Sequence, residues 1–485
     1  MTFSLLLSQS FYDISWDGQT YHQEAIIQLA NGWNPFHQQH SPDKVSDIWV
    51  AHYAKSTWIY AAALYEVTHS IEASKAFNIL FIISSFFLGT AALIHFPRIS
   101  LSQALVLSFL LAFNPVSIYQ SLTFYVDGQQ SSLLVSLLSI SYLWIVRAEY
   151  FNVLAFTYLA NICVLANIKF TGLVYASIFL FALIIWLLIQ RNPQLTIKVA
   201  FLGSFSLLLG VVFIGYNPYI TNTIYNGHPF YPLAGNNKLD IISTNIPQNF
   251  IDKNRLEKLF LSTFSQSSNK FTFSNSSNKY LPESSKLKLP FTLQNEEELK
   301  SLSEYDLRVG GFGSLFSGAI ILSLIVCLIS INIDLSKTKI ALLVMSFLMA
   351  SVLINPEPWW ARYVPQFWML PLMASILALS LKNRILKVLG YGIIIVLTAN
   401  IFLVSSNYLD KNLKMTQAIE QQLRTISSTK QPLVVSFAGD FRSNRIRFAE
   451  WGIKFREVKD LKELPCKAEP LIGSQTLFCV STNYP

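Results

Sequence analysis

The sequence predicts an all-α polytopic membrane protein with large regions outside the bilayer and a small α/β appendage at its C-terminus. Two observations support this fold class. Of the 485 residues, 52% are hydrophobic and 13% are charged, whereas about a quarter of the residues in a soluble domain are charged. About ten apolar runs, each long enough or nearly long enough to cross a bilayer, contain no Asp, Glu, Lys or Arg. These properties exclude a soluble globular enzyme.

The apolar runs predict about 10–11 transmembrane helices, in a first group within residues 76–217 and a second group within residues 314–406. Their expected bounds are 76–96, 101–119, 131–146, 151–167, 172–190, 199–217, 314–331, 340–354, 364–380 and 388–406. Three large regions, 1–75, 218–313 and 407–485, are expected outside the membrane. The Ser/Asn-rich stretch 262–288 is expected to be flexible or lid-like, and residues 409–428 are expected to form a separate helix.

The distribution of basic residues predicts the orientation. One set of short connections is rich in Lys and Arg, and the opposite short connections carry only Lys169 and Arg362. Because basic residues mark cytoplasmic loops, we expect all three large regions on the extracytoplasmic face. The basic connections contain Arg98, Arg147, Arg191, Lys198, Lys337, Lys339, Lys382, Arg384 and Lys387. The formal net charge of +8 is then largely a topology signal and indicates no nucleic-acid partner.

A membrane span is expected ahead of the first outer loop. Residues 1–10 offer only a short apolar run at positions 5–7, without the basic segment and cleavage site of a signal peptide. We therefore expect a missing or incomplete first span, with a chain that begins on the outer side as the alternative. In the C-terminal region, Cys466 and Cys479 both lie on the predicted outer face. The sequence is compatible with a disulfide between them and with two free thiols.

The first outer loop places two acids beside an aromatic residue. Asp13 and Asp17 stand on either side of Trp16, and residues 20–30 follow with the apolar spacing of a short amphipathic helix suited to the membrane interface. An aspartate here either caps that helix or supplies a carboxylate for chemistry.

A second loop repeats the tripeptide Asp-Gly-Gln, which occurs at 17–19 and at 127–129. Asp17 and Asp127 are thus predicted to lie on the same face at the depth of the membrane surface. Two carboxylates there could act as a base and a substrate clamp, or could hold a divalent metal. The pair His37 and His40 also leaves a metal site open.

Cations on the outer face are few. Lys169 is either an interfacial lysine or a positive charge offered to a phosphate. Arg362 lies in the segment NPEPWWARY with Glu357, and its planar guanidinium suits a pair of phosphate oxygens. His52 and Lys55 precede a further amphipathic helix in the first loop.

With these residues in place, the chain resembles the GT-C superfamily of integral membrane glycosyltransferases, which use polyprenyl- or dolichyl-phosphate-linked sugars. The resemblance rests on Trp16-Asp17 followed by Tyr21, on Tyr-Val-Asp-Gly at 125–128, and on the WWARY segment with Arg362. It covers most of residues 11–406. Its motifs match by their position in the predicted topology more than by exact residues. The sequence departs from the superfamily's pattern at the span before the first outer loop, which we expect to be missing or incomplete.

The resemblance implies a transfer of sugar from a polyprenyl-phosphate donor to a glycan, lipid or protein acceptor, by inverting displacement, at a bacterial inner or plasma membrane. It implies that Asp17 is the base, with Asp13 as the alternative, and that Asp127 is the second acid. The candidate substrate-binding residues are Lys55, His52, Lys169, Arg362, Glu357, Gln19 and Tyr21. This chemistry requires no cofactor, and the sequence leaves the binding of a divalent metal undecided.

Two other functions remain as alternatives. A polysaccharide polymerase or ligase would use a diphosphate-linked oligosaccharide and rely on arginines, of which the short outer loops carry only Arg362. A flippase for lipid-linked glycans would mark its path with ionisable residues or broken helices inside the spans. The predicted spans carry no such charges, which favours the transferase.

Overall fold

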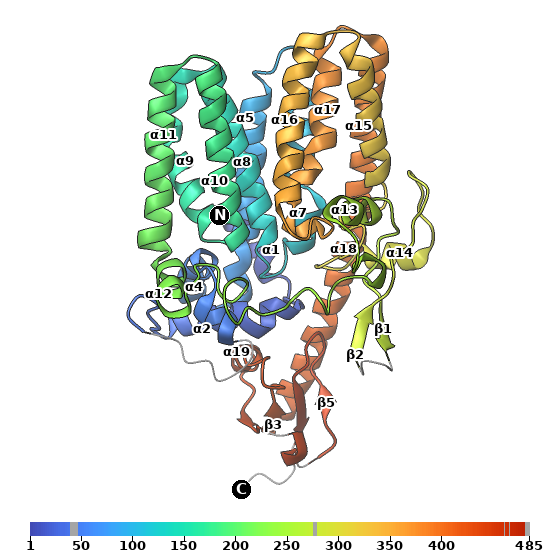
Figure 1. Ribbon diagram of the computed structural model, residues 1–485. Helices are drawn as coiled ribbons and strands as arrows, with labels where there is room; N and C mark the ends of the chain where they lie inside the picture. The colour runs from blue at the N-terminus through green and yellow to red at the C-terminus, as the bar shows by residue number, and fades with distance from the viewer. Residues whose placement is uncertain (39–46, 275–278, 460, 465, 481–485) are drawn as a thin grey trace.

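The chain folds into a helical bundle that carries the extramembrane parts at one end (Figure 1). The computed structural model describes residues 1–38, 47–274, 279–459, 461–464 and 466–480. Within these residues, seven helices are long and apolar enough to cross a membrane, and three shorter apolar helices accompany them. Each predicted run corresponds to one of these helices, which confirms the all-α polytopic fold class.

The helices of the bundle fall into two groups along the chain. The first group contains α5 (Phe77–Leu93), α6 (Leu101–Ala112), α8 (Asp127–Val146), α9 (Phe151–Ala166), α10 (Phe170–Ile189) and α11 (Pro193–Leu208). The second group contains α15 (Phe316–Ile331), α16 (Leu335–Ile354), α17 (Met369–Ser380) and α18 (Arg384–Thr429). Large side chains such as Phe156 and Phe201 point outwards and are exposed, as expected for a surface that faces lipid.

The prediction of one helix over residues 101–119 is wrong. It divides into α6 and a short helix α7 (Pro115–Gln120). Pro115 occupies the first turn of α7, where its missing N–H costs nothing, and Asn114 Oδ1 caps the turn by accepting the Ser117 N–H at 3.0 Å. α7 packs against α8, and Asp127 is the first residue of α8.

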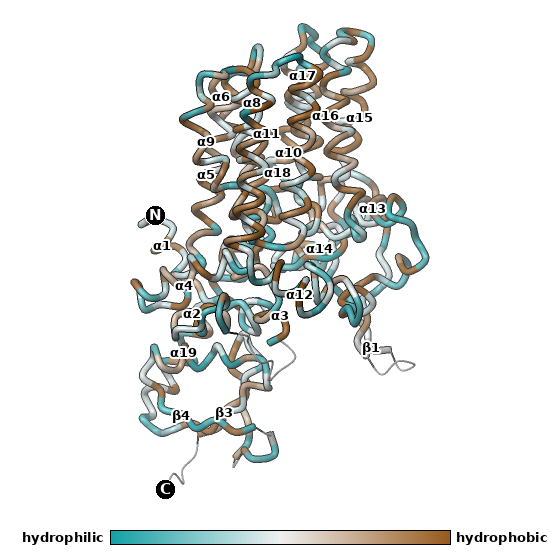
Figure 2. Tube along the Cα trace, turned by 60° about the vertical axis from the view of Figure 1, so that its left-hand side comes forward, coloured by the Kyte–Doolittle hydropathy of each residue, from teal (hydrophilic) through white to brown (hydrophobic). Residues whose placement is uncertain are grey.

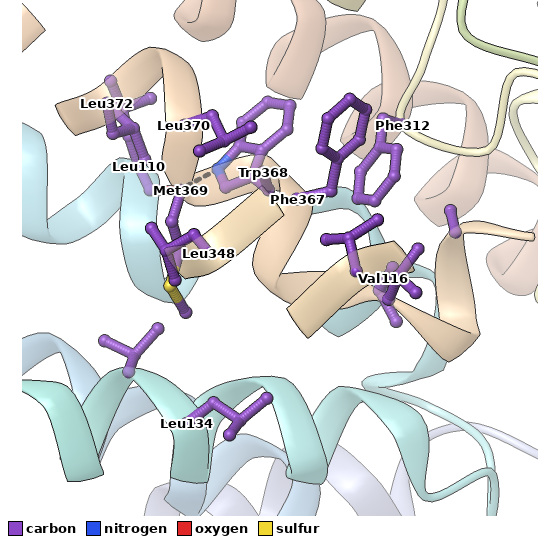
Figure 3. Packing of buried hydrophobic residues seen from close by; sticks show 14 of the residues in the cluster. Leu110, Val116, Leu134, Phe312, Leu348, Phe367, Trp368, Met369, Leu370 and Leu372 are labelled. Atoms are coloured by element: carbon purple, nitrogen blue, oxygen red, sulfur yellow. Dashed lines mark hydrogen bonds between the residues drawn. The ribbon is translucent and has the colours of Figure 1, made fainter. Parts of the chain in front are cut away.

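Buried apolar side chains join the two groups. Figure 3 shows Leu110 of α6, Leu348 of α16, Trp368 and Phe312 in one buried cluster, to which Leu134 of α8 also belongs. The indole N–H of Trp368 donates to the carbonyl oxygen of Leu110 at 2.8 Å. The two groups therefore form one packed body.

The last span is longer than predicted. A span at 388–406 and a separate helix at 409–428 were expected, but α18 is one helix of 46 residues. No glycine or proline interrupts the sequence between these two parts, and a helix of that length extends about 70 Å, well beyond the apolar thickness of a bilayer. The C-terminal domain is thus carried on a rigid extension of a membrane span.

The region before the first span is mostly helical. It contains α1 (Thr2–Gln9), the π-helical turn η1 (Gly18–His22), α2 (Gln23–Ala30), α3 (Asp47–His52), α4 (Ser56–Thr68) and the 3₁₀ turn η2 (Glu72–Ala76). The amphipathic helix predicted at 20–30 is present as α2, but its apolar face is not at a lipid surface. Ala25 and Ile26 are buried against Trp58 and Ala61 of α4, so protein covers this face.

The region between the two groups of spans contains α12 (Thr221–Asn226), α13 (Arg255–Thr263), α14 (Glu296–Ser301), and an antiparallel pair of strands, β1 (Phe271–Ser274) and β2 (Lys279–Pro282). The end of α13 and both strands fall within the stretch 262–288 that was expected to be flexible or lid-like. The composition of residues 262–288 therefore did not predict the helix end and the strands that the structure describes there.

The C-terminal region is the small α/β appendage that the sequence predicted. It contains β3 (Leu433–Ser436), α19 (Asn444–Glu450), β4 (Phe455–Glu457), β5 (Glu469–Pro470) and β6 (Leu477–Val480), with the strand order β4-β3-β6-β5. β3 pairs in parallel with β4 and antiparallel with β6. Ile419 and Leu423 of α18 share its core with Phe448. Cys466 and Cys479 are joined as a disulfide.

Three arginines of the C-terminal domain bind three acids of the region before the first span. Arg442 lies 2.8 Å from Asp47, and Arg445 lies 2.8 Å from Glu24. The third pair is fully buried: Arg447 lies 2.9 Å from Glu72, which also binds Lys75. Ion pairs and packing thus fix this domain to the loop that contains Asp13 and Asp17.

Replacing Glu72 by glutamine is expected to weaken this contact by about 3–5 kcal/mol, because Lys75 and Arg447 would stay buried without their shared counter-charge. The measurement is the rate at which trypsin cleaves within residues 430–480 of the protein in lipid nanodiscs. Glu420→Gln, on the exposed face of α18, is the matched control. Equal cleavage rates in both variants would contradict the assigned role of Glu72.

Candidate active site

Asp17 lies at the end of the bundle where the regions outside the spans meet. It occupies the N-cap position of the π-helical turn η1, and its side chain remains 25% exposed, with Oδ2 3.7 Å from a terminal nitrogen of Arg362. Burial raises the pKa of Asp17, and the neighbouring Arg362 opposes this rise. The Tyr21 side chain also lies near the Asp17 carboxylate and lowers its pKa. The result is an accessible carboxylate with a bias towards accepting a proton.

Arg362 connects Asp17 with a third acid. It lies in the short turn η7 (Ala361–Tyr363), and its Nε is 3.3 Å from Oδ1 of Asp306. Its guanidinium carbon stands 4.4 Å from the ring centre of Trp360 and 5.2 Å from that of Tyr125. Neighbouring acids, Asp306 foremost, raise the pKa of Arg362 despite its burial. Arg362 is therefore a fixed positive charge held by stacking.

Asp306 is the residue that the sequence analysis missed. The indole N–H of Trp360 donates to its Oδ1 at 2.8 Å, and Arg308 lies 4.0 Å from its Oδ2. Asp306 belongs to the polar end of the 218–313 region, a few residues before a span, in the aromatic and charged segment Tyr-Asp-Leu-Arg at 305–308. That local composition was the only signal in the sequence.

Asp127 and Lys169 form a buried ion pair beside Arg362. Lys169 Nζ lies 2.6 Å from Asp127 Oδ1, and the Gln120 side-chain amide donates to Oδ2 at 3.1 Å. Asp127 is at the first position of α8, where the helix dipole favours a negative charge. Lys169 also stands 4.4 Å from the ring centre of Tyr363, the residue after Arg362. We call Asp17, Asp127, Lys169, Asp306 and Arg362 the charged site.

His22 adds a neutral imidazole next to the charged site. It ends the π-helical turn that begins after Asp17, and such turns are frequent at functional sites. Its Nδ1 accepts the indole N–H of Trp58 at 2.7 Å. Because an indole is only a donor, the imidazole proton must reside on Nε2. Burial lowers the pKa of His22 to about 3, so the ring is neutral near pH 7.

Asp13 is placed differently from Asp17. It is fully buried, and its carboxylate accepts the backbone N–H groups of Ser15 at 2.8 Å and Phe124 at 3.2 Å. A Cβ added at Gly18 would lie 1.8 Å from its Oδ2, so only a glycine fits against it. Asp13 thus organises the turn that holds Asp17, and has no exposed surface for a substrate.

The pKa of Asp13 gives a pH-dependent prediction. Burial and the nearby Glu72 raise it from 3.8 to about 6. The folded state therefore binds this proton more tightly than the unfolded state, so the stabilisation is complete below pH 3.8 and is lost as the pH rises through about 6. We expect the wild type to lose about 3 kcal/mol over this window relative to Asp13→Asn. Parallel thermal-unfolding profiles of the two proteins from pH 4 to 7 would contradict it.

Two further candidates have their polar atoms engaged away from the charged site. Lys55 donates to the carbonyl oxygens of Ala51 at 3.1 Å and Tyr53 at 2.8 Å, and to the side chain of Asn217 at 2.8 Å. These three bonds use all three ammonium protons, and burial lowers the pKa of Lys55 well below its usual value. His52 Nδ1 lies 2.8 Å from the Asn222 side-chain oxygen.

Gln19 and Glu357 also have structural partners. The Gln19 side-chain amide donates to the Gly473 carbonyl oxygen at 2.7 Å and accepts from Asn444 at 3.1 Å, which ties η1 to the C-terminal domain. Glu357 binds Lys258 of α13 at 3.0 Å. Of the predicted substrate-binding residues, the structure thus brings Lys169, Arg362 and Tyr21 together with Asp17 and Asp127, and places the other four elsewhere.

Metal-binding groups do not gather in the part of the chain that the structure describes. Among these residues, no three His, Cys, Asp or Glu side chains are arranged to hold a metal ion. His37 is among them, whereas His40 lies outside the described residues.

Fold and site together define a multi-pass membrane protein with a charged, aromatic-walled site at one end of its helical bundle. Comparison with known proteins found no matching family model and no matching curated protein. Among solved structures, the chain is similar to ArnT from Cupriavidus metallidurans, whose crystal structure contains undecaprenyl phosphate. The TM-score is 0.42 at 10% sequence identity, and the alignment covers 95% of this chain and 84% of that one.

Proposed function

We propose that this protein is a membrane glycosyltransferase of the GT-C type, which transfers a sugar from a polyprenyl-phosphate donor to an extracytoplasmic acceptor. One observation carries the proposal: the accessible carboxylate of Asp17 lies 3.7 Å from the fixed cation Arg362. Glycosyl transfer from a phosphate requires a base for the acceptor hydroxyl and a cation for the departing phosphate. Both groups are adjacent here.

Asp17 is the base in this proposal. The acceptor oxygen forms a bond to the sugar C1 as its proton passes to Asp17. The bond between C1 and the phosphate oxygen breaks, and its electron pair leaves with the polyprenyl phosphate. Attack opposite to the leaving group inverts C1. The raised pKa of Asp17 suits this role, since a base becomes more effective as its conjugate acid becomes weaker.

Arg362 is the phosphate-binding residue in this proposal. In the resting protein its charge is shared between Asp17 and Asp306. When Asp17 takes the acceptor proton, that carboxylate becomes neutral, and more of the Arg362 charge is available to the phosphate that is gaining negative charge. The interaction is therefore stronger in the transition state than in the ground state, as catalysis requires.

Lys169 and Asp127 have a supporting role in the proposal. Lys169 is neutralised by Asp127 at 2.6 Å and contacts the ring of Tyr363, so the pair supports the residue that follows Arg362. The location of the site suits a lipid-linked donor, because a polyprenyl chain in the bilayer presents its phosphate at the membrane surface, where the spans of this protein end.

The test is donor turnover by the purified protein in nanodiscs. Polyprenyl phosphates carrying hexoses, pentoses or amino sugars are supplied, and free polyprenyl phosphate is measured by mass spectrometry. Release with at least one of these donors, and none with nucleotide sugars, is expected. Turnover of diphosphate-linked oligosaccharides alone would favour the polymerase or ligase. Movement of a labelled donor between leaflets without bond cleavage would favour the flippase.

A further inference from the structure

The region between α12 and α15 presents an apolar surface that the proposed reaction does not use. α13 exposes Leu256 and Phe260, four residues apart and therefore on one face. A neighbouring segment exposes Leu287, Leu289, Phe291 and Leu293. Leu289 is 72% exposed and Phe260 is 55% exposed, which is unusual for large apolar side chains outside a membrane span.

These two segments form one surface. The Lys288 N–H donates to the Phe264 carbonyl oxygen at 2.9 Å, and the Gln266 N–H donates to the Lys286 carbonyl oxygen at 2.8 Å. The Phe260 and Phe264 rings stack with 4.7 Å between their centres. The surface formed by residues 255–264 and 287–293 is here called the apolar strap.

The apolar strap is attached to the ends of two membrane spans. Arg255 donates to the carbonyl oxygen of Leu353 at 2.9 Å, in the last turn of α16. Phe291 lies against Gly318 in the first turns of α15, where an added Cβ would be 2.3 Å from its ring. In both views, α13 lies beside the lower end of α15 (Figures 1 and 2).

The outward face of α15 continues into the strap. Gly318 and Ile325 are seven residues apart, which places them on the same side of the helix, and Ile325 is exposed. Whatever covers Ile325 in the membrane therefore extends towards the exposed edge of Phe291. Exposed Lys286 and Arg255 flank the apolar residues, and basic residues beside an apolar face are typical of segments at the surface of a bilayer.

We propose that the apolar strap inserts into the interface of the same bilayer that the bundle crosses, with Leu256, Phe260, Leu289 and Phe291 among the lipid acyl chains. The partner is thus a lipid surface. This inference does not depend on sugar transfer, and it fixes the depth of the bundle: the junctions of α15 and α16 with the region between the two groups of spans lie at the level of the head groups.

The test uses single cysteines in the full-length protein, labelled with bimane and reconstituted in nanodiscs of phosphatidylethanolamine and phosphatidylglycerol. Leu289→Cys and Leu256→Cys report on the strap at separate points, so that one remains if the other does not fold. Glu297→Cys is the matched control, because Glu297 is an exposed polar residue that follows the strap in sequence. The unsubstituted chain corrects for labelling of the buried Cys163 and Cys327.

Most of the bimane emission at Leu289→Cys or Leu256→Cys is expected to be lost with doxyl-labelled lipid and retained with iodide. The reverse is expected at Glu297→Cys. Quenching of both strap positions by iodide would overturn the proposal, because the strap would then face water. Protection from both quenchers would also overturn it, because a second copy of the chain or another protein would then cover the surface.

Discussion

Asp17→Asn is expected to reduce the rate of sugar transfer by about 10²–10⁴-fold, which is the usual contribution of a general base. Asparagine keeps the size of the side chain but cannot take the acceptor proton. Asp17 is accessible and accepts no buried backbone N–H in the described structure, so we expect folding and membrane insertion to be unchanged. The measurement is polyprenyl-phosphate release, with the loss in kcat and little change in the donor KM.

The matched control for this prediction is Asp410→Asn. Asp410 is an exposed aspartate on α18 that pairs with Lys414 at the surface, and its replacement should leave activity unaltered. Full activity in Asp17→Asn would disprove the assignment of the base. Full activity in the double variant Asp13→Asn/Asp17→Asn would disprove the mechanism, because no acid of the first predicted pair would then be needed.

Arg362→Lys is expected to cost about 10²–10³-fold in kcat/KM, comparable to the loss of one transition-state hydrogen-bond donor. A lysine retains the charge, but it lacks the planar fork that binds a phosphate with two parallel bonds. It would also lose the flat contact with Trp360. Both kcat and the donor KM should change, since phosphate is present in the ground state and gains charge in the transition state.

Arg424→Lys is the control for this substitution. Arg424 is exposed on α18, and exchanging it tests whether any loss of an arginine affects the assay. If Arg362→Lys kept wild-type kcat/KM while Arg362→Gln lost activity, charge alone would matter and the two-point contact would be wrong. If Arg362→Gln were also fully active, Arg362 would have no role in binding the donor phosphate.

The fold class was predictable because hydrocarbon penalises charge. A membrane span must be apolar along its length, and this requirement is local and visible in sequence. Interruptions were harder to predict: Pro115 divides one expected span, whereas nothing ends α18 where the apolar residues end. Apolar character reports the environment of a segment, but helix continuity depends on backbone hydrogen bonding and caps, which follow a different set of residues.

The charged site was predictable in part. Asp127, Lys169 and Arg362 were identified because an acid or a base at the end of an apolar span is conspicuous. Asp17 was identified because it follows Trp16 and precedes an amphipathic segment. Asp306 was missed because it lies within a long polar region, where one more aspartate carries no signal. Only the packing of Trp360 and Arg362 around it distinguishes Asp306 from its neighbours.

The sequence by itself determined that this is a polytopic membrane protein, because the cost of a charge in lipid acts on each segment separately. Tertiary structure decided which outer charges face one another. Asp13 and Asp17 are both candidate acids in the sequence. In the structure, Asp13 is buried against Gly18, whereas Asp17 is partly exposed. Lys55 and Arg362 look like equal phosphate ligands, yet all three Lys55 protons are used by the protein. Burial and partner choice are properties of residues distant in the chain, so only the folded structure fixes them.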